Sequence, residues 1–263
     1  LGAHGHRESA MATALSQAYN NWLHQFCSVQ PDRLKGVAVL PVQNIEESVE
    51  ELHRGVTELG FVGGTMPNRA ALGRGNLDDP AYNPLWEAAQ ALDVPICIHN
   101  NFVHPTVESH RFSSYIEAKP IHDPVENMLA VQALIFGGVF DHFPGLRLGI
   151  MEGGVGWIPF WLDRLTEYYE EFLAGRLPRG GPIEYLRGGE CFFSFEVDET
   201  TVGYVADVIG TDRLLFASDY FHHDAKYPNS VTNVLNRTDL NDDGKRKVLN
   251  TNPAAFYGPR LVA

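Results

Sequence analysis

The residues best suited to chemistry follow three short apolar stretches of the chain. His99 ends the stretch "VPICIH", Glu152 follows "LRLGIM" and Asp219 follows "LLFAS". Neutral imidazole is the commonest metal ligand in proteins. A carboxylate placed directly after a buried strand costs several kcal/mol unless it is paired or bound to a metal ion. These three residues are therefore candidate metal ligands or proton-transfer groups.

Each candidate also has a purely structural explanation. Asp219 could cap the helix that follows it, and Glu152 could form an ion pair with Arg164, further along the chain. A single histidine is more often a structural or surface residue than a ligand. However, His99 adjoins two asparagines, and the sequence "HHD" at 222–224 comes soon after Asp219. A polar pocket is therefore the favoured interpretation.

Six apolar runs, each followed by a segment with helical spacing, must position these residues. The runs are apolar on both faces, as in parallel strands covered by helices. The strands are predicted to be parallel, in barrel order, and to end at or near Pro41, Asn68, Asn101, Gly153, Asp198 and Asp219. Helices are predicted at 8–28, 44–60, 81–93, 124–140, 157–173 and 200–210. Polar residues gather at the carboxyl ends of the strands, where (β/α)8 barrels have their active sites.

Six βα units do not close an eight-stranded barrel, because strand number, tilt and shear are linked. Either the sheet is open, or two N-terminal βα units lie outside these 263 residues, and we expect the second. No GxGxxG follows the first strand, which leaves a dinucleotide-binding fold little support. The sequence thus predicts a single α/β barrel domain over residues 1–263, incomplete at its N-terminal end.

Composition limits the partners and the compartment. The chain has 20 Lys and Arg against 33 Asp and Glu, and its net charge of −13 argues against nucleic acid or an anionic membrane as partner. Cys27, Cys97 and Cys191 are far apart and lack CxxC spacing, so we expect small buried side chains in a reducing compartment. No apolar run approaches the ~18 residues that span a bilayer, and no signal peptide opens the chain. These features predict a cytoplasmic protein.

Three segments together resemble one known family. They are "ICIHNN", "LRLGIMEGGVGWIPFWLDRL" and "LLFASDYFHHD". With the helical segment before "DRLKGVAVLP", they are similar to the amidohydrolase-related family that contains aminocarboxymuconate semialdehyde decarboxylase. The resemblance extends from Tyr19 to Tyr257. It implies a distorted (β/α)8 barrel, a homodimer, and one divalent metal ion, usually zinc, with manganese or magnesium as alternatives.

The resemblance also implies metal ligands. In the family these are an HxH pair after the first strand, a histidine after the fifth and an aspartate after the eighth. His99 matches the third ligand and Asp219 the last. His4 and His6 have the HxH spacing, but no strand precedes them and they lie just ahead of a predicted helix. We therefore expect these two histidines in a loop, and the true pair upstream of this chain.

Two departures from the family bear on the mechanism. Glu152 stands where the family often has histidine, and Phe221 stands where proline is usual. In the implied mechanism Asp219 relays a proton at the metal, while Glu152 activates water or, if burial keeps it protonated, donates a proton. The pocket for a small planar substrate is expected to be shaped by Phe102, Trp157, Phe221 and His222.

Three functions remain open from the sequence. The resemblance favours non-oxidative decarboxylation of a small unsaturated or aromatic acid. Glutamate at position 152 keeps metal-dependent hydrolysis of an amide, lactone or C–C bond as an alternative, since glutamate and histidine differ in charge and pKa. Without the HxH pair, the chain could instead be a metal-free barrel that acts as a binding protein.

Overall fold

The strands form one parallel sheet in chain order. The structure, a computed structural model, describes residues 8–69, 75–100 and 111–261. Every pair of neighbouring strands in the order β1-β2-β3-β4-β5-β6 is parallel. The strands are β1 (Ala38–Val39), β2 (Gly64–Pro67), β3 (Ile96–His99), β4 (Leu148–Met151), β5 (Cys191–Phe195) and β6 (Leu214–Phe216). The predicted parallel order is confirmed for these six units.

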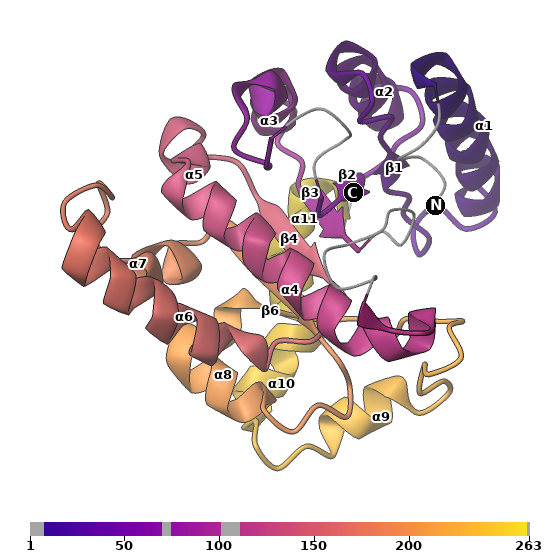
Figure 1. Ribbon diagram of the computed structural model, residues 1–263. Helices are drawn as coiled ribbons and strands as arrows, with labels where there is room; N and C mark the ends of the chain where they lie inside the picture. Colours follow the sequence, from indigo (N-terminus) through magenta and orange to yellow (C-terminus); the bar gives the residue numbers. More distant parts are fainter. Residues whose placement is uncertain (1–7, 70–74, 101–110, 262–263) are drawn as a thin grey trace.

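Helices follow the strands and surround the sheet, which lies at the centre of the molecule (Figure 1). They are α1 (Ser9–Cys27), α2 (Ile45–Thr57), α3 (Asn83–Ala91), α4 (Tyr115–Phe136), α5 (Val139–His142), α6 (Trp157–Tyr168), α7 (Pro182–Arg187), α8 (Val202–Ile209), α9 (Ser230–Leu235), α10 (Asp242–Arg246) and α11 (Asn252–Tyr257). Among the described residues, no helix is both long enough and apolar enough to cross a membrane.

The hydrophobic core lies between the sheet and these helices. Its largest fully buried side chains include Trp86 on α3, Tyr82 directly before α3, and Phe193 and Phe195 on β5. All five residues of β5 are buried, as expected for a strand covered on both faces. This packing holds the carboxyl ends of the strands at one edge of the sheet, where the polar residues follow.

The strands end one to three residues before the predicted positions. Strand β4 ends directly before Glu152, because this residue adopts a positive φ angle of 61°; Asp219, three residues after the end of β6, also has a positive φ angle, of 49°. Such a left-handed residue cannot continue an extended strand. The sequence located the strand ends correctly to within a few residues but did not reveal this turn.

The helix predicted at 124–140 is wrong in its bounds. Helix α4 begins nine residues earlier, at Tyr115, and contains Pro120 and Pro124. Proline is favoured in the first turn of a helix, so the sequence pattern pointed to a start at 124. The true start has its own signal, since the Ser114 hydroxyl accepts a hydrogen bond from the Glu117 N–H, as in a capping box. A separate short helix, α5, covers the end of the predicted range.

Two cysteines lie inside the molecule, as predicted. Cys97 and Cys191 are buried, Cys27 is partly buried, and none of the three forms a disulfide. Burial raises the pKa of the Cys97 thiol to about 12, partly offset by the hydroxyl of Tyr257. Neither buried thiol carries charge at neutral pH, so both behave as small hydrophobic side chains.

Asn20 of α1 completes the hydrogen bonding of β1. Its side-chain amide accepts from the Val39 N–H at 2.9 Å and donates to the Val39 carbonyl at 3.0 Å, as a neighbouring strand would. The same amide donates to Glu51 Oε1 of α2 at 2.6 Å. Both Asn20 and Glu51 are almost completely buried. The Asn20 side chain therefore connects its own helix, α1, to helix α2 and to strand β1.

Replacing Asn20 with alanine should destabilise the fold by about 2–3 kcal/mol, because the buried Val39 N–H and carbonyl would lose their bonds to the amide and Glu51 would lose one of its donors while keeping Arg54. The exposed neighbour Asn21, which accepts a hydrogen bond from Arg54, provides a matched control. Asn21→Ala should change the free energy of unfolding by less than about 1 kcal/mol. Urea denaturation of both variants measures the difference, and equal effects would contradict the assigned role of Asn20.

Candidate active site

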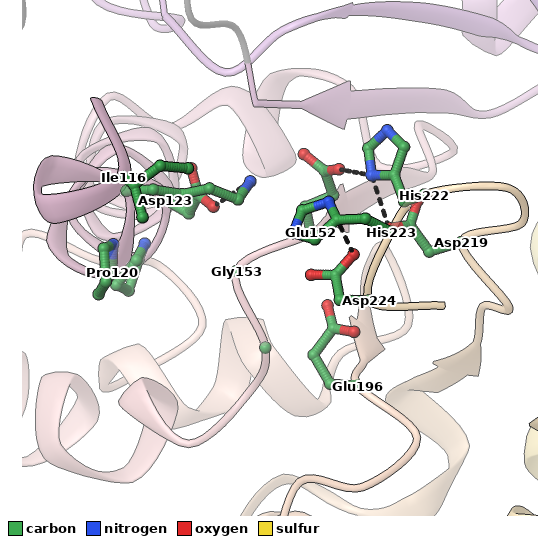
Figure 2. Close-up of a pocket in the computed structure, with 13 residues that line it drawn as sticks. Ile116, Pro120, Asp123, Glu152, Gly153, Glu196, Asp219, His222, His223 and Asp224 are labelled. Atoms are coloured by element: carbon green, nitrogen blue, oxygen red, sulfur yellow. Dashed lines mark ion pairs between the residues drawn. The ribbon is translucent and has the colours of Figure 1, made fainter. Parts of the chain in front are cut away.

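A cavity of about 650 Å³ opens where polar residues follow strands β4, β5 and β6. One wall is formed by the first half of α4, and the opposite wall carries acidic and histidine side chains, with Gly153 between the two (Figure 2). The residues that line it are Ile116, Lys119, Pro120, Asp123, Pro124, Glu152, Gly153, Gly154, Glu196, Asp219, His222, His223 and Asp224.

Three side chains on one wall of the cavity offer a set of metal ligands. Ligand atoms of Glu152, Asp219 and His222 all lie within 4.8 Å of one another. His222 Nδ1 is 2.8 Å from Asp219 Oδ2 and 3.9 Å from Glu152 Oε1. We refer to these three residues as the acid–histidine cluster.

The backbone turns at Glu152 and Asp219 aim their side chains into the cavity. A left-handed conformation at a residue other than glycine costs on the order of 1–3 kcal/mol and persists only when its surroundings fix it. At Glu152 two buried side chains do so. Its N–H donates to Ser194 Oγ at 3.0 Å, and its carbonyl accepts from Asn127 Nδ2 at 2.8 Å. Strand β5 and helix α4 thus hold the residue from both sides.

Buried amides extend this support across the strand ends. Asn127 Oδ1 accepts from Asn68 Nδ2 at 3.0 Å, and the same Asn68 nitrogen donates to Asn100. All three asparagines are buried. Asn68 follows β2, Asn100 follows β3, and Asn127 belongs to α4. The network is only partly paired, because among the described residues the Asn68 side-chain oxygen and the Asn100 side-chain nitrogen have no hydrogen-bond partner. It connects the position of Glu152 to the middle of the sheet.

Glu199 ties the loop after β5 to the loop after β4. Its carboxylate accepts from the N–H groups of Val155, at 3.0 Å, and Gly156, at 2.5 Å, and from Thr201 Oγ1 at 2.9 Å. Val155 and Gly156 lie at the start of α6, where N–H groups lack helical partners and negative charge is favoured. Arg237 in turn donates to the Glu199 carbonyl at 2.6 Å.

The cavity contains more carboxylates than cations. Asp123, Glu152, Glu196, Asp219 and Asp224 line it together with a single lysine. Loss of solvation at the Glu196 carboxyl, together with repulsion from Asp219 and Asp224, raises its pKa to about 7. Much of Glu196 is exposed, but its carboxyl lines the cavity. Loss of solvation and the surrounding negative charge together bring the titration of this carboxyl close to neutral pH.

This donor set fits a divalent cation. Two carboxylates and an imidazole lie together, and the surplus negative charge around them would be neutralised by a bound ion. Carboxylate and imidazole ligands suit manganese, zinc and iron, and no thiol belongs to the group. The strained backbone at Glu152 and Asp219 brings the two carboxylates together despite their mutual repulsion, which a purely structural site would not require.

His99 lies beside the acid–histidine cluster. Its Nδ1 is 3.8 Å from Glu152 Oε2 and 2.9 Å from the Asn100 carbonyl oxygen. The ligand atoms that the structure brings together belong to Glu152, Asp219 and His222. An ion shared by His99 and Asp219 therefore stays a prediction. His222, which the sequence suggested as a substrate contact, belongs to the candidate ligand group and lines the cavity, and its contact with a substrate stays a prediction.

The other predicted site residues lie around the cavity or outside the described chain. Trp157 is not among the lining residues: its Nε1 donates to the Gly154 carbonyl at 2.9 Å, and its ring packs edge-on against Phe193. Phe221 is 83% exposed. Arg164 pairs with Glu167, so it does not neutralise Glu152. The predictions for Phe102, His4 and His6 concern residues outside the described ranges.

Comparison with known proteins assigns the family. A family model described as Amidohydrolase matches residues 1–258. The chain belongs to the amidohydrolase family. This amidohydrolase is 30% identical over 213 residues to a 2-amino-3-carboxymuconate-6-semialdehyde decarboxylase of Dictyostelium discoideum, covering 80% of the chain and 57% of that relative. It is 26% identical to a gamma-resorcylate decarboxylase of Rhodococcus jostii, covering 95% of the chain and 78% of the relative.

A solved structure confirms the fold class. Dihydroxybenzoic acid decarboxylase from Polaromonas sp. JS666, with bound manganese and the inhibitor 2-nitroresorcinol, matches with a TM-score of 0.84 at 23% identity. The match covers 97% of this amidohydrolase and 79% of that chain. The predicted (β/α) barrel class and the family resemblance are therefore confirmed. Two further N-terminal βα units, which would complete a barrel of eight, stay a prediction.

Asp219→Asn and His222→Ala should each weaken binding of Mn²⁺ by at least about 100-fold, because even the loss of a residue that only supports a ligand typically costs 10- to 100-fold. His223, which lines the same cavity but is 81% exposed at its side chain, provides the control. His223→Ala should bind Mn²⁺ as the unmodified protein does. Titration calorimetry measures the affinities, and an unchanged affinity in His222→Ala would remove that residue from the ligand set.

Glu196→Gln should remove a pH dependence of stability in the metal-free protein. The pKa is about 7 in the folded protein and close to the ordinary value of 4.5 in the unfolded chain. The folded state therefore binds more protons between these values, and stability falls as pH rises through this window. The difference in free energy of unfolding, Glu196→Gln minus unmodified protein, should therefore increase from about pH 5 to about pH 8.

Urea denaturation at a series of pH values measures that difference. Glu87→Gln, a change of the same kind at an exposed position of α3, should give a difference that does not vary with pH in this way. A difference between Glu196→Gln and the unmodified protein that is constant over the same range would contradict the raised pKa.

Proposed function

We propose that this amidohydrolase catalyses the metal-dependent, non-oxidative decarboxylation of a small aromatic or unsaturated carboxylic acid. The observation that supports it most directly is the acid–histidine cluster on one wall of a 650 Å³ cavity. The relatives named above include decarboxylases of such acids. In this proposal Glu152, Asp219 and His222 hold one divalent ion, and the small-molecule substrate enters the cavity in front of them.

The reaction breaks the bond between the carboxyl group and the adjacent carbon, releases carbon dioxide and replaces it with a proton. When bound, the ion would act as a Lewis acid that draws electron density from substrate oxygens. The electron pair of the broken bond stays on the substrate carbon, which must then receive the proton. No oxidant or reductant is needed, because the carbon only exchanges one substituent for another.

Asp219 is the proposed proton carrier. Its carboxyl group lines the cavity with Oδ2 2.8 Å from His222 Nδ1, so it lies at the proposed ion site and faces the space for the substrate, where it can deliver a proton. Glu152 is the second proton-transfer candidate, since its two oxygens lie 3.8 Å from His99 Nδ1 and 3.9 Å from His222 Nδ1. The glycines at 153 and 154 leave space for the substrate next to the Glu152 carboxylate.

Metal-dependent hydrolysis of an amide, lactone or C–C bond is the alternative function. The observation that favours it is the carboxylate of Glu152 at the cavity wall, because a carboxylate can act as general base toward water. The two reactions differ in their products: one releases carbon dioxide without net uptake of water, and the other incorporates water. A metal-free binding protein finds no support in a cavity with so many carboxylates. Zinc as the ion, a homodimer and a cytoplasmic location stay predictions.

Glu152→Gln should lower kcat for decarboxylation by roughly 100- to 10,000-fold, the usual effect of losing one acid–base group, while retaining an oxygen ligand for the ion. The assay uses manganese-loaded protein with gamma-resorcylate and related hydroxybenzoates, and measures carbon dioxide release. His223→Ala is the control and should keep near-normal turnover.

Near-normal turnover in Glu152→Gln would leave Asp219 as the only proton-transfer group. The proposed reaction itself would fail if the unmodified, manganese-loaded protein released no carbon dioxide from any of these acids. Incorporation of labelled water into a product would then support the hydrolase.

A further inference from the structure

The turn that presents Glu152 is left-handed over three residues in succession. Glu152, Gly153 and Gly154 have φ angles of 61°, 77° and 66°. Glycine adopts such angles at little cost, but a run of three takes the backbone out of both strand and helix geometry, so the turn must be held at both ends. The hydrogen bonds with Ser194 and Asn127 hold its first residue. The other end of the turn, where helix α6 begins, needs a partner of its own.

The carboxylate of Glu199 is that partner. Its two oxygens accept from the Val155 N–H at 3.0 and 3.1 Å, and Oε1 also accepts from the Gly156 N–H. A Cβ atom at Gly154 would lie 3.1 Å from Oε1 and 3.2 Å from Oε2. The absence of a side chain at this glycine therefore allows the turn to close tightly around the carboxylate.

Glu199 is itself fixed from the opposite side. Arg237, whose side chain is only 9% exposed, donates to the Glu199 carbonyl at 2.6 Å and to the Val197 carbonyl at 2.9 Å. Asp239 holds the same guanidinium group through both of its carboxylate oxygens, at 2.9 and 2.6 Å. The Glu199 carboxylate therefore extends from a firmly held loop toward the turn that begins at Glu152.

We infer that Glu199 is a positioning residue that acts through Glu152. Its carboxylate fixes the end of the left-handed turn, and the turn sets the direction in which the Glu152 side chain leaves the backbone toward Asp219 and His222. Glu199 is not among the described lining residues, so it supports the site from behind the cavity wall. Its negative charge also suits the start of α6, whose N–H groups carry partial positive charge. The inference rests on the proposed function in one respect, the role of Glu152 as a ligand of the divalent ion.

A comparison of glycine and alanine at position 152 tests the inference in metal-free protein. Glycine tolerates a left-handed conformation and alanine does not, so Glu152→Gly should unfold at a higher urea concentration than Glu152→Ala. Because both variants lack the carboxylate, the difference between their urea midpoints reports the left-handed turn. Adding Glu199→Ala to each variant should reduce this difference by at least about half, since the turn is no longer held at its far end. A difference that persists in full would overturn the inference.

Binding of Mn²⁺ tests whether the effect reaches the ion site. Glu199→Ala should weaken binding by about 10- to 100-fold, the usual cost of removing a residue that supports a ligand. Glu199→Gln, which keeps an acceptor oxygen, should weaken it less. When Glu152→Ala is already present, Glu199→Ala should weaken binding less than about 2-fold further, because its effect passes through the missing carboxylate. The electron paramagnetic resonance of free Mn²⁺ measures both strong and weak binding.

Asn44→Ala provides the matched control. Asn44 accepts from two N–H groups at the start of α2, much as Glu199 does at the start of α6. It is not among the residues that line the cavity. Asn44→Ala should therefore lower the urea midpoint of the protein, but leave unchanged both the Mn²⁺ affinity and the glycine–alanine difference at position 152.

Two results of the Mn²⁺ titrations would overturn the inference. One is an unchanged affinity in both Glu199 variants. The other is an equally large loss of affinity when Glu152→Ala is already present, which would show that Glu199 acts through another group, such as Glu196, whose N–H it accepts at 3.4 Å. If the unmodified protein or Glu152→Ala bound no Mn²⁺, the urea comparison alone would decide the role of Glu199. Failure of the unmodified protein to bind the ion would overturn the proposed function instead.

Discussion

The candidate site depends on one backbone constraint, the left-handed conformation of Glu152 directly after strand β4. An extended residue at this point would continue along the strand, and its carboxylate would not meet His222 and Asp219. The conformation is unfavourable for glutamate by itself, and two hydrogen bonds fix it. The Glu152 N–H donates to Ser194, and the Glu152 carbonyl accepts from Asn127. These two partners come from a neighbouring strand and from the helix across the cavity. The position of a catalytic candidate is thus set by the whole carboxyl edge of the sheet.

The crowding of carboxylates in the cavity is a second energetic cost of the site, besides the strained backbone at Glu152. Five carboxylates line one cavity, and loss of solvation together with repulsion from neighbouring carboxylates raises the pKa of Glu196 to about 7. A protein selected for stability alone would pair or remove these charges. Some acidic groups elsewhere in the described chain are neutralised by arginine, as in the contacts of Arg179 with Asp141 and Glu190. In the cavity, five carboxylates share one lysine and two histidines, an arrangement that a bound cation would stabilise.

Much of this architecture was predictable because it depends on patterns that are local in sequence. Apolar runs of four to five residues revealed the parallel strands, and a polar residue after each run identified the edge where Glu152 and Asp219 gather. The start of α4 was not predictable in the same way, since Pro120 and Pro124 outweighed the capping signal at Ser114. That error hid Lys119, which becomes a cavity residue only once the helix is extended back over it.

The residues that support Glu152, Ser194 and Asn127, could not be identified from the sequence for a different reason. Ser194 lies within the buried strand "CFFSF" and Asn127 within an apolar helix, so neither differs in sequence from an ordinary polar residue in a core. Their roles arise from contacts over 42 and 25 residues of chain, which no local pattern encodes. Glu196 did follow an apolar strand, but its raised pKa depends on burial and on carboxylates in the loops after β4 and β6, which are distant in sequence.

The two prolines of α4 have a consequence for the way this molecule can change. Pro120 and Pro124 have no N–H, so the helix lacks the hydrogen bonds that would reach the carbonyls of Ile116 and Pro120. The half of α4 that lines the cavity is therefore held less firmly by its own backbone than the half that carries Asn127. Natural variation in the first half can alter the shape and charge of one wall while Asn127 keeps Glu152 in position. Within a single helix, the fold separates a segment free to diverge toward new substrates from a segment that must conserve the chemistry.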